Sequence, residues 1–172
     1  MKVLLIIGLV LAIVGIIAMS IAGCNAHYVY IRQISNYWDL ADRCSTIEAK
    51  SDYIDKFVDA IEKADMSEYN AILYPTPENS FKNNLDAIKT LRDRLHQIKT
   101  MNPASFEYNQ AIQQITAQEQ GEAKNLLFNI DGCWTKANYW YLWDWVGGFI
   151  IISILFFGGL SSITLLVIIE NE

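Results

Sequence analysis

The chain has 172 residues with a formal net charge of −6, and 52% of them are hydrophobic. This acidic balance, without a basic stripe, excludes nucleic acid as an expected partner. The two histidines, His27 and His96, cannot supply the paired Glu-x-x-His sets of di-iron bundles, and the sequence has no phosphate-binding loop, nucleophile elbow or zinc spacing. We therefore predict a protein that is not an enzyme, with no catalytic residues, no metal and no cofactor.

An apolar segment, residues 1–24, opens the chain. No charged residue occurs from Val3 to Gly23, and a run of about 21 residues is long enough for a transmembrane helix. Tyr28 and Tyr30 follow it, and such amphipathic rings concentrate at membrane–water interfaces. A second interpretation stays open, because Ile21-Ala22-Gly23-Cys24 resembles the lipobox of bacterial lipoproteins, in which the cysteine is lipidated after signal-peptide cleavage.

Residues 25–145 carry nearly all of the charge, and their apolar residues recur at helical spacing. This segment predicts one α-helical extramembrane domain without strands. Its first stretch predicts a long helix or coiled-coil seam that ends near Met66. The apolar residues of that stripe are Ile34, Trp38, Leu40, Ala41, Ile47, Ile54, Phe57, Val58 and Ile61.

Two further helices are expected after a break at residues 67–76, where Pro75 and Pro77 disfavour helical geometry. Thr76-Pro77-Glu78 is a start signal for a shorter helix of about 24 residues. The apolar residues of this helix are Phe81, Leu85, Ile88, Leu91, Leu95 and Ile98. Asn102-Pro103 repeats the start signal and opens a third, long helix with Tyr108, Ile112, Ile115, Leu126, Ile130, Cys133 and Ala137.

The two long helices are expected to run antiparallel, with the shorter helix beside them. If their membrane-proximal ends face each other, Trp38 meets Trp134 as an aromatic pair just above the membrane. The same register places Cys44 and Cys133 about five residues out of step, or ~7–8 Å along the axis. A disulfide cannot span that distance without a shift, so free buried thiols are favoured and the bridge stays an alternative.

Residues 113–123, QQITAQEQGEA, are a polar patch that interrupts the apolar stripe of the third helix. The simpler interpretation is a solvated face, because the register above pairs Lys50 with Glu122 and Glu48 with Lys124, and exposed ion pairs contribute little. The alternative is a ligand or ion site between helices. Its residues would be Thr116, Glu119 and Glu122.

A dense group of aromatic residues precedes the last apolar segment. It predicts a membrane-interface collar, made of Tyr139, Trp140, Tyr141, Trp143 and Trp145 together with Tyr28 and Tyr30. Residues 146–169 carry no charge and predict a second transmembrane helix, followed by a short acidic tail, residues 170–172. Small residues suit close helix packing in lipid, although glycine is also common in membrane helices generally. These residues are Gly8, Ala12, Gly15, Gly158 and Ser162.

The predicted fold is an all-α membrane protein in which two transmembrane helices flank an extramembrane antiparallel helical bundle of two long helices and one shorter helix. Both termini are expected in the cytoplasm and the bundle on the extracytoplasmic side, because Lys2 and the N-terminal amino group favour an inside N-terminus. A prokaryotic envelope is expected, because no asparagine lies in an Asn-x-Ser/Thr sequon. The expected partners are membrane lipids and other membrane-protein subunits or copies of the chain. The expected function is a non-catalytic scaffold or accessory subunit. The alternative is a ligand-binding sensor or transport-associated module that uses the polar patch.

Overall fold

The computed structural model describes the backbone of residues 2–170, and within that range it leaves out the side chains of residues 2, 4–5, 116–123, 165–166 and 169–170. The elements in chain order are α1 (Lys2–Tyr30), the π-helix η1 (Ile31–Ser35), α2 (Asn36–Asp42), α3 (Ile47–Lys63), the 3-10 helix η2 (Pro77–Asn79), α4 (Phe81–Lys99), α5 (Phe106–Asn138), the 3-10 helix η3 (Trp140–Leu142) and α6 (Asp144–Glu170). Residues 2–170 include no strand, only an isolated bridge between Asn70 and Ser80. The predicted all-helical class is therefore confirmed.

The chain divides into two compact units. The first, called here the hairpin unit, contains Met1–His27 and Tyr139–Glu172, and the second, the helical unit, contains Tyr28–Asn138. The extramembrane segment predicted from the sequence, residues 25–145, is longer than the helical unit at both ends. Asn171 and Glu172 of the predicted tail lie outside the described residues.

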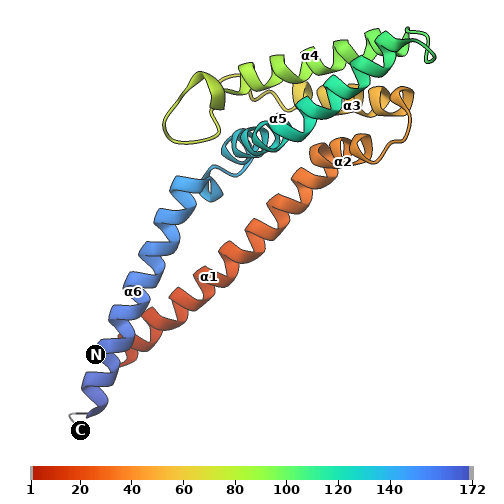
Figure 1. Cartoon of the computed structure of the whole chain (residues 1–172). Helices are drawn as coiled ribbons and strands as arrows, with labels where there is room; N and C mark the ends of the chain where they lie inside the picture. The colour runs from red at the N-terminus through yellow and green to blue at the C-terminus, as the bar shows by residue number, and fades with distance from the viewer. Residues whose placement is uncertain (1, 171–172) are drawn as a thin grey trace. The chain divides into compact units, whose positions relative to one another are not determined.

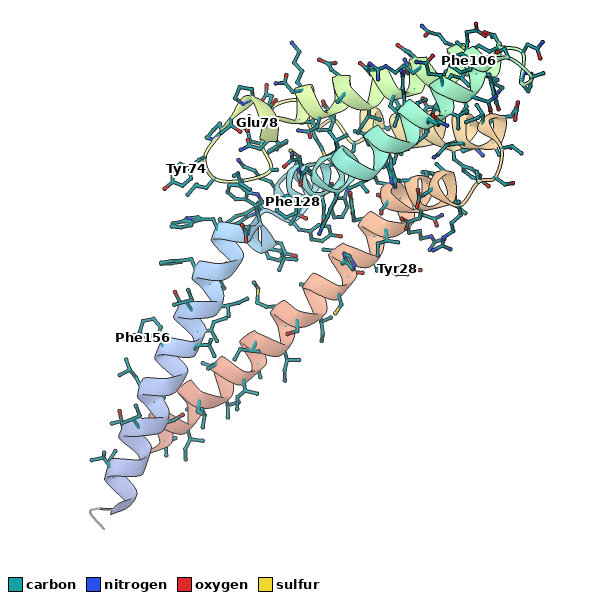
Figure 2. The ribbon with its side chains drawn as sticks, in the orientation of Figure 1. Tyr28, Tyr74, Glu78, Phe106, Phe128 and Phe156 are labelled. Carbon is teal, nitrogen blue, oxygen red and sulfur yellow. The ribbon has the colours of Figure 1, made fainter. Side chains whose placement is uncertain are left out.

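Two helices have the length and composition to cross a membrane. They lie within Ile6–Asp42 and Asp144–Thr164, and almost none of the residues in their most apolar parts are buried inside the protein. A core helix of a soluble protein would be buried on at least one face. Figure 2 shows the side chain of Phe156 projecting from α6 on the side away from α1. The apolar side chains of these helices are therefore mostly exposed at the surface of the chain rather than buried within it.

Within the hairpin unit, α1 and α6 approach each other through small residues (Figure 1). A Cβ atom added to Gly8 would lie 2.9 Å from the Ser161 hydroxyl oxygen, and one added to Gly158 would lie 2.8 Å from the Cβ of Ala12. The residue numbers of each contacting pair add up to 169 or 170, which defines an antiparallel register. Larger side chains at these glycines would push the helices apart.

The first long helix that the sequence predicts is interrupted in the helical unit, so the prediction of one continuous helix is wrong. α2 ends at Asp42 and α3 begins at Ile47. Thr46 between them is extended, and its side-chain oxygen accepts a hydrogen bond from the backbone N–H of Ala49, as an N-cap does. The break lets α2 pack against α3, with the rings of Trp38 and Phe57 in edge contact at 5.4 Å.

α3 and α4 pack side by side in antiparallel orientation (Figure 1). Polar pairs join their exposed edges: the ion pairs Glu62 with Lys89 and Asp52 with Lys99, and a hydrogen-bond contact between Asp55 and His96. The residue numbers of every pair add up to 151, so all three pairs define one register. Between the helices lies a buried apolar core, made of Ile54, Phe57, Val58 and Ile61 from α3 and Ile88, Leu91, Leu95 and Ile98 from α4.

α5 packs against α4, and its buried residues are Ile115, Ile130, Cys133 and Trp134. The predicted start signals are displaced by a few residues. Thr76 does act as a cap, but for the 3-10 turn η2, and the Ser80 side chain then caps α4 by accepting from the Asn83 N–H. Asn102-Pro103 does not open α5, because the Ser105 hydroxyl accepts the N–H of Tyr108 instead.

Candidate functional site

Residues 64–80 connect α3 to α4, and an asparagine side chain fixes the second half of this connection. Asn79 is buried; its side-chain oxygen accepts from the Thr76 N–H at 3.0 Å, and its side-chain nitrogen donates to the Tyr74 carbonyl at 2.8 Å. Thr76 returns a hydrogen bond by accepting from the Asn79 N–H. This reciprocal capping box holds the proline-containing turn in one shape.

Two more asparagines tie the same turn to the helices behind it. The side-chain nitrogen of Asn84, on α4, donates to the carbonyls of Glu78 and Ser80 at 2.8 and 2.7 Å. The side-chain nitrogen of Asn129, on α5, donates to the Glu78 carbonyl at 3.0 Å and to the Asn84 side-chain oxygen at 3.1 Å. Because each amide has its partners, the network is stabilising rather than a source of unpaired buried groups.

The first half of the connection lies directly on α5. A Cβ added to Gly132 would lie 2.7 Å from the backbone oxygen of Ala71, so glycine is needed for this approach. The buried thiol of Cys133 donates to the Tyr69 carbonyl at 3.6 Å, and burial raises the pKa of Cys133 to about 12. A thiol with such a raised pKa is protonated at neutral pH, and its hydrogen bond ties α5 to the connection.

A groove of about 740 Å³ lies where this connection, α4 and α5 meet, and we call it the asparagine groove. Its volume is in the usual range of ligand sites, ~300–1,000 Å³. Its lining residues are Ile72, Thr76, Pro77, Glu78, Asn79, Asn83, Asn84, Asn125, Leu126, Phe128 and Asn129. Figure 2 labels two of these residues, Glu78 and Phe128, and Phe128 is 63% exposed.

The groove is chemically suited to binding. It contains five asparagines and one carboxylate, Glu78, but no histidine, cysteine or lysine. Over the part of the chain that the structure describes, no group of three or more His, Cys, Asp or Glu side chains is placed to hold a metal ion. Carboxamides donate and accept hydrogen bonds without titrating, so the groove offers polar recognition beside the exposed ring of Phe128.

The predicted collar residues are divided between the two units. In the hairpin unit, Trp140 and Trp145 are exposed, whereas Trp143 is buried. Tyr139 and Tyr141 are half-buried, and their rings lie 6.3 Å apart. The other two residues belong to the helical unit, in which Tyr28 is exposed and Tyr30 is buried.

The burial of Tyr30 has a clear cause. Its ring lies 5.5 Å from that of Trp134, and its hydroxyl donates to the Leu127 carbonyl at 3.4 Å. The described ring contacts thus give Trp134 the partner Tyr30 and give Trp38 the partner Phe57. α2, which carries Trp38, packs against α3. The pairing of Trp38 with Trp134 stays a prediction.

The remaining predicted residues have mixed outcomes. The structure places Gly8, Ala12, Gly15 and Gly158 at the contact between α1 and α6, together with Ser161, which the sequence analysis does not name. The Ser162 hydroxyl donates within its own helix, to the Gly158 carbonyl.

The side chains of Thr116, Glu119 and Glu122, and with them the proposed polar site and the Lys50–Glu122 pair, lie outside the described part of α5. Cys24 is an exposed residue inside α1. The three cysteines are free, and the Cys44 thiol donates to the Leu40 carbonyl. The geometry therefore agrees with free thiols at Cys44 and Cys133.

The asparagine groove is the feature that the sequence analysis misses. Its sequence signal is the concentration of asparagine around the prolines, at Asn70, Asn79, Asn83 and Asn84. Taken together, the described residues define an all-α protein with two helices apolar enough to cross a membrane. The chain matches no protein-family model, no curated protein and no solved structure in the comparisons made with each.

Proposed function

We propose that this chain is a non-catalytic, membrane-anchored accessory subunit that docks through its helical unit onto a larger membrane complex or onto another copy of itself. In this proposal, α1 and α6 cross the membrane as an antiparallel hairpin, and the helical unit is an extramembrane bundle. Both termini lie in the cytoplasm and the bundle lies on the extracytoplasmic side of a prokaryotic envelope. The exposed apolar surface of both helices supports the anchoring.

The observation that carries the docking proposal is the exposed aromatic surface beside the asparagine groove. Phe128 lines the groove with most of its surface in solvent, and Leu73 and Tyr74, in the connection between α3 and α4, are also exposed. Burying apolar surface stabilises by about 25 cal/mol per Å², and aromatic side chains are enriched at the centres of protein interfaces. A partner that covers these rings gains that free energy.

The surface behind the aromatic rings is already rigid. The hydrogen bonds of Asn79, Asn84 and Asn129 fix the turn before any partner arrives. Association then costs little ordering of the loop, which favours affinity. The partner chemistry that fits is an apolar side chain for the rings next to a backbone segment whose peptide groups pair with the exposed amide of Asn125.

A site-specific photo-crosslinker tests this docking in native membranes. Placed at Phe128, it should give one discrete adduct, whose mass identifies either a second copy of the chain or another subunit. Phe106 is the matched control, because it lies on the same helix, is 77% exposed and does not line the groove. Equal crosslinking at both positions, or none at Phe128, contradicts the proposal.

The alternative function, a ligand-binding sensor or transport-associated module, makes a different prediction for the same sample. The purified protein would then carry a stoichiometric small molecule, and photo-crosslinking at Phe128 would give no protein adduct. Substituting Glu119 or Glu122 would release that molecule if the polar patch of residues 113–123 binds it.

A further inference from the structure

A second groove lies entirely within the hairpin unit, between α1 and the start of α6. Its volume is about 450 Å³. The residues that line it are Ile16, Met19, Ser20, Gly23, Leu142, Asp144, Gly147, Gly148 and Ile151. All but Ser20 and Asp144 are apolar or glycine, so the groove is largely hydrocarbon-lined. We call it the hairpin groove.

The groove exists because the two helices separate toward η3. They are in close contact at Gly8 and Gly158, and Gly15 would still place a Cβ 3.3 Å from Ile154. Farther along, a Cβ on Gly23 or on Gly148 meets nothing within 4 Å. Small residues therefore continue on both helices beyond the point where the helices touch, and the space that they leave is open.

The size of the groove limits what occupies it. An α-helix with its side chains is ~10–12 Å wide and rises ~5.4 Å per turn, so one turn fills roughly 400–600 Å³. A volume of about 450 Å³ thus holds about one turn of a partner helix, which is too little for a membrane-spanning helix. A single hydrocarbon chain is narrow and flexible enough to follow it.

The two polar residues at the groove, Ser20 and Asp144, differ in whether their side chains already have hydrogen-bond partners. The Ser20 hydroxyl already donates to the Ile16 carbonyl at 2.9 Å. The carboxylate of Asp144, in the first turn of α6, has no hydrogen bond or ion pair among the described side chains. Among the described side chains of the hairpin unit there is no lysine or arginine to pair with this carboxylate.

We propose that the hairpin groove binds one acyl chain of a zwitterionic phospholipid with a primary-amine head group, of the phosphatidylethanolamine class, whose ammonium pairs with Asp144. This inference depends on the membrane anchoring proposed above. An ammonium group offers three N–H donors to a carboxylate. A choline head group has no N–H donor, and the net negative charge of an anionic phospholipid is repelled by Asp144.

The experiment uses the full chain in nanodiscs made from equal amounts of ethanolamine, choline and glycerol phospholipids, followed by gentle release and native mass spectrometry. The expected result is one ethanolamine phospholipid retained per chain. Gly148→Leu should abolish its retention, because the new side chain enters the open groove. Gly159→Leu is the matched control, because Gly159 also faces open space but does not line the groove.

A second variant separates the head group from the acyl chain. Asp144→Asn should keep one retained lipid but remove the preference for the ethanolamine class. Equal retention of the three classes by the native chain, or unchanged retention in Gly148→Leu, overturns the proposal. A dimer without lipid also overturns it, since a second copy would then occupy the groove.

Alkaline carbonate extraction distinguishes failure of this inference from failure of the anchoring. A chain that stays in the membrane after carbonate treatment but retains no lipid refutes the lipid site alone. A chain released by carbonate refutes the membrane anchoring on which the inference depends. Photo-crosslinking at Phe128 reports the docking function independently of both results.

Discussion

The hairpin unit and the helical unit are both made of helices, but different interactions hold them together. In the hairpin unit, glycine, alanine and serine bring two backbones close, and large apolar side chains point outward. In the helical unit, large apolar side chains fill a core, and ion pairs and caps lie around it. Burial of large side chains drives packing in water, and small-residue contacts are typical of helices that associate in lipid. The difference therefore agrees with the membrane anchoring proposed above.

The contrast is sharpest for two phenylalanines. Phe57 is fully buried and contacts Trp38, whereas Phe156 is exposed on α6. Phe57→Ala should lower the free energy of unfolding by about 3–5 kcal/mol, because it removes a large core side chain and leaves a cavity. Phe156→Ala should leave it unchanged. The measurement is denaturant-induced loss of helical circular dichroism of the full chain in detergent micelles, and equal effects of the two substitutions would contradict the division into unlike units.

Glycines give the next comparison. Gly132→Ala should destabilise the helical unit by about 1–3 kcal/mol, because the added methyl group meets the backbone of Ala71. That cost exceeds the helix-propensity gain of about 1 kcal/mol for the same substitution. Hydrogen exchange should show faster exchange in residues 67–76. Gly159→Ala is the control, since its methyl group enters open space. If residues 67–76 exchange their amide hydrogens equally slowly in both variants, the close approach of Gly132 to Ala71 is refuted.

A substitution of Asn129 tests the network of asparagine hydrogen bonds in the helical unit. Asn129→Ala should cost about 1–3 kcal/mol, because it removes the donor to the Glu78 carbonyl and to the Asn84 side-chain oxygen. Asn125→Ala should have little effect on stability, since Asn125 is exposed in the same groove. Thermal unfolding of both variants measures the difference. If Asn125→Ala proves the more destabilising, the assigned network is incorrect.

Sequence periodicity predicts α4 well and the break before α3 poorly, and the reason is physical. The apolar stripe of α4 repeats without interruption, and five of its six predicted positions, all except the half-buried Leu85, are buried. The stripe before α3 also keeps its spacing across residues 43–46, because Leu40 and Ile47 are seven residues apart. Periodicity alone therefore favours one continuous helix. The hydroxyl of Thr46, which caps α3, and the packing of Trp38 on Phe57 favour a break instead. The packing of Trp38 on Phe57 is a tertiary contact, which periodicity does not reveal.

The asparagine groove is hard to predict for the same reason. Asn84 and Asn129 are far apart in the sequence, and their partners are backbone carbonyls, which every residue has. A side chain that recognises a carbonyl therefore leaves no complementary residue type in the sequence. The small-residue contact of the hairpin is easier to predict, because glycine and alanine at helical spacing on both segments already indicate close packing.

Serine hydroxyls give a smaller but sharper comparison. In the hairpin unit, Ser20, Ser153 and Ser161 each donate to a carbonyl one turn earlier, which gives each hydroxyl a partner within its own helix. Ser51 in the helical unit is buried, and its hydroxyl has no partner. Ser51→Ala should therefore leave stability unchanged or raise it by about 1 kcal/mol. A clear loss of thermal stability in this variant would mean that the hydroxyl is bonded in the folded protein.

The smallest expected effect concerns Glu62, whose hydrogen bond to Lys89 lowers its pKa. A carboxylate with a lowered pKa in the folded state stabilises the fold above its unfolded pKa, and this contribution is lost as the pH falls through the lower, folded value. Glu62→Gln should therefore remove a small contribution at neutral pH and none at strongly acidic pH. Because the pair is exposed, salt should screen it.

A carboxyl-resolved NMR titration measures this effect directly. The pKa of Glu62 in the native chain should lie below its value in Lys89→Ala, and the two should converge at high salt. The variant Lys99→Ala, which breaks the neighbouring pair with Asp52, is the control that should leave Glu62 in place. If Lys89→Ala does not move the pKa of Glu62, the contact between α3 and α4 depends on the buried core alone, and the ion pairs only mark its register.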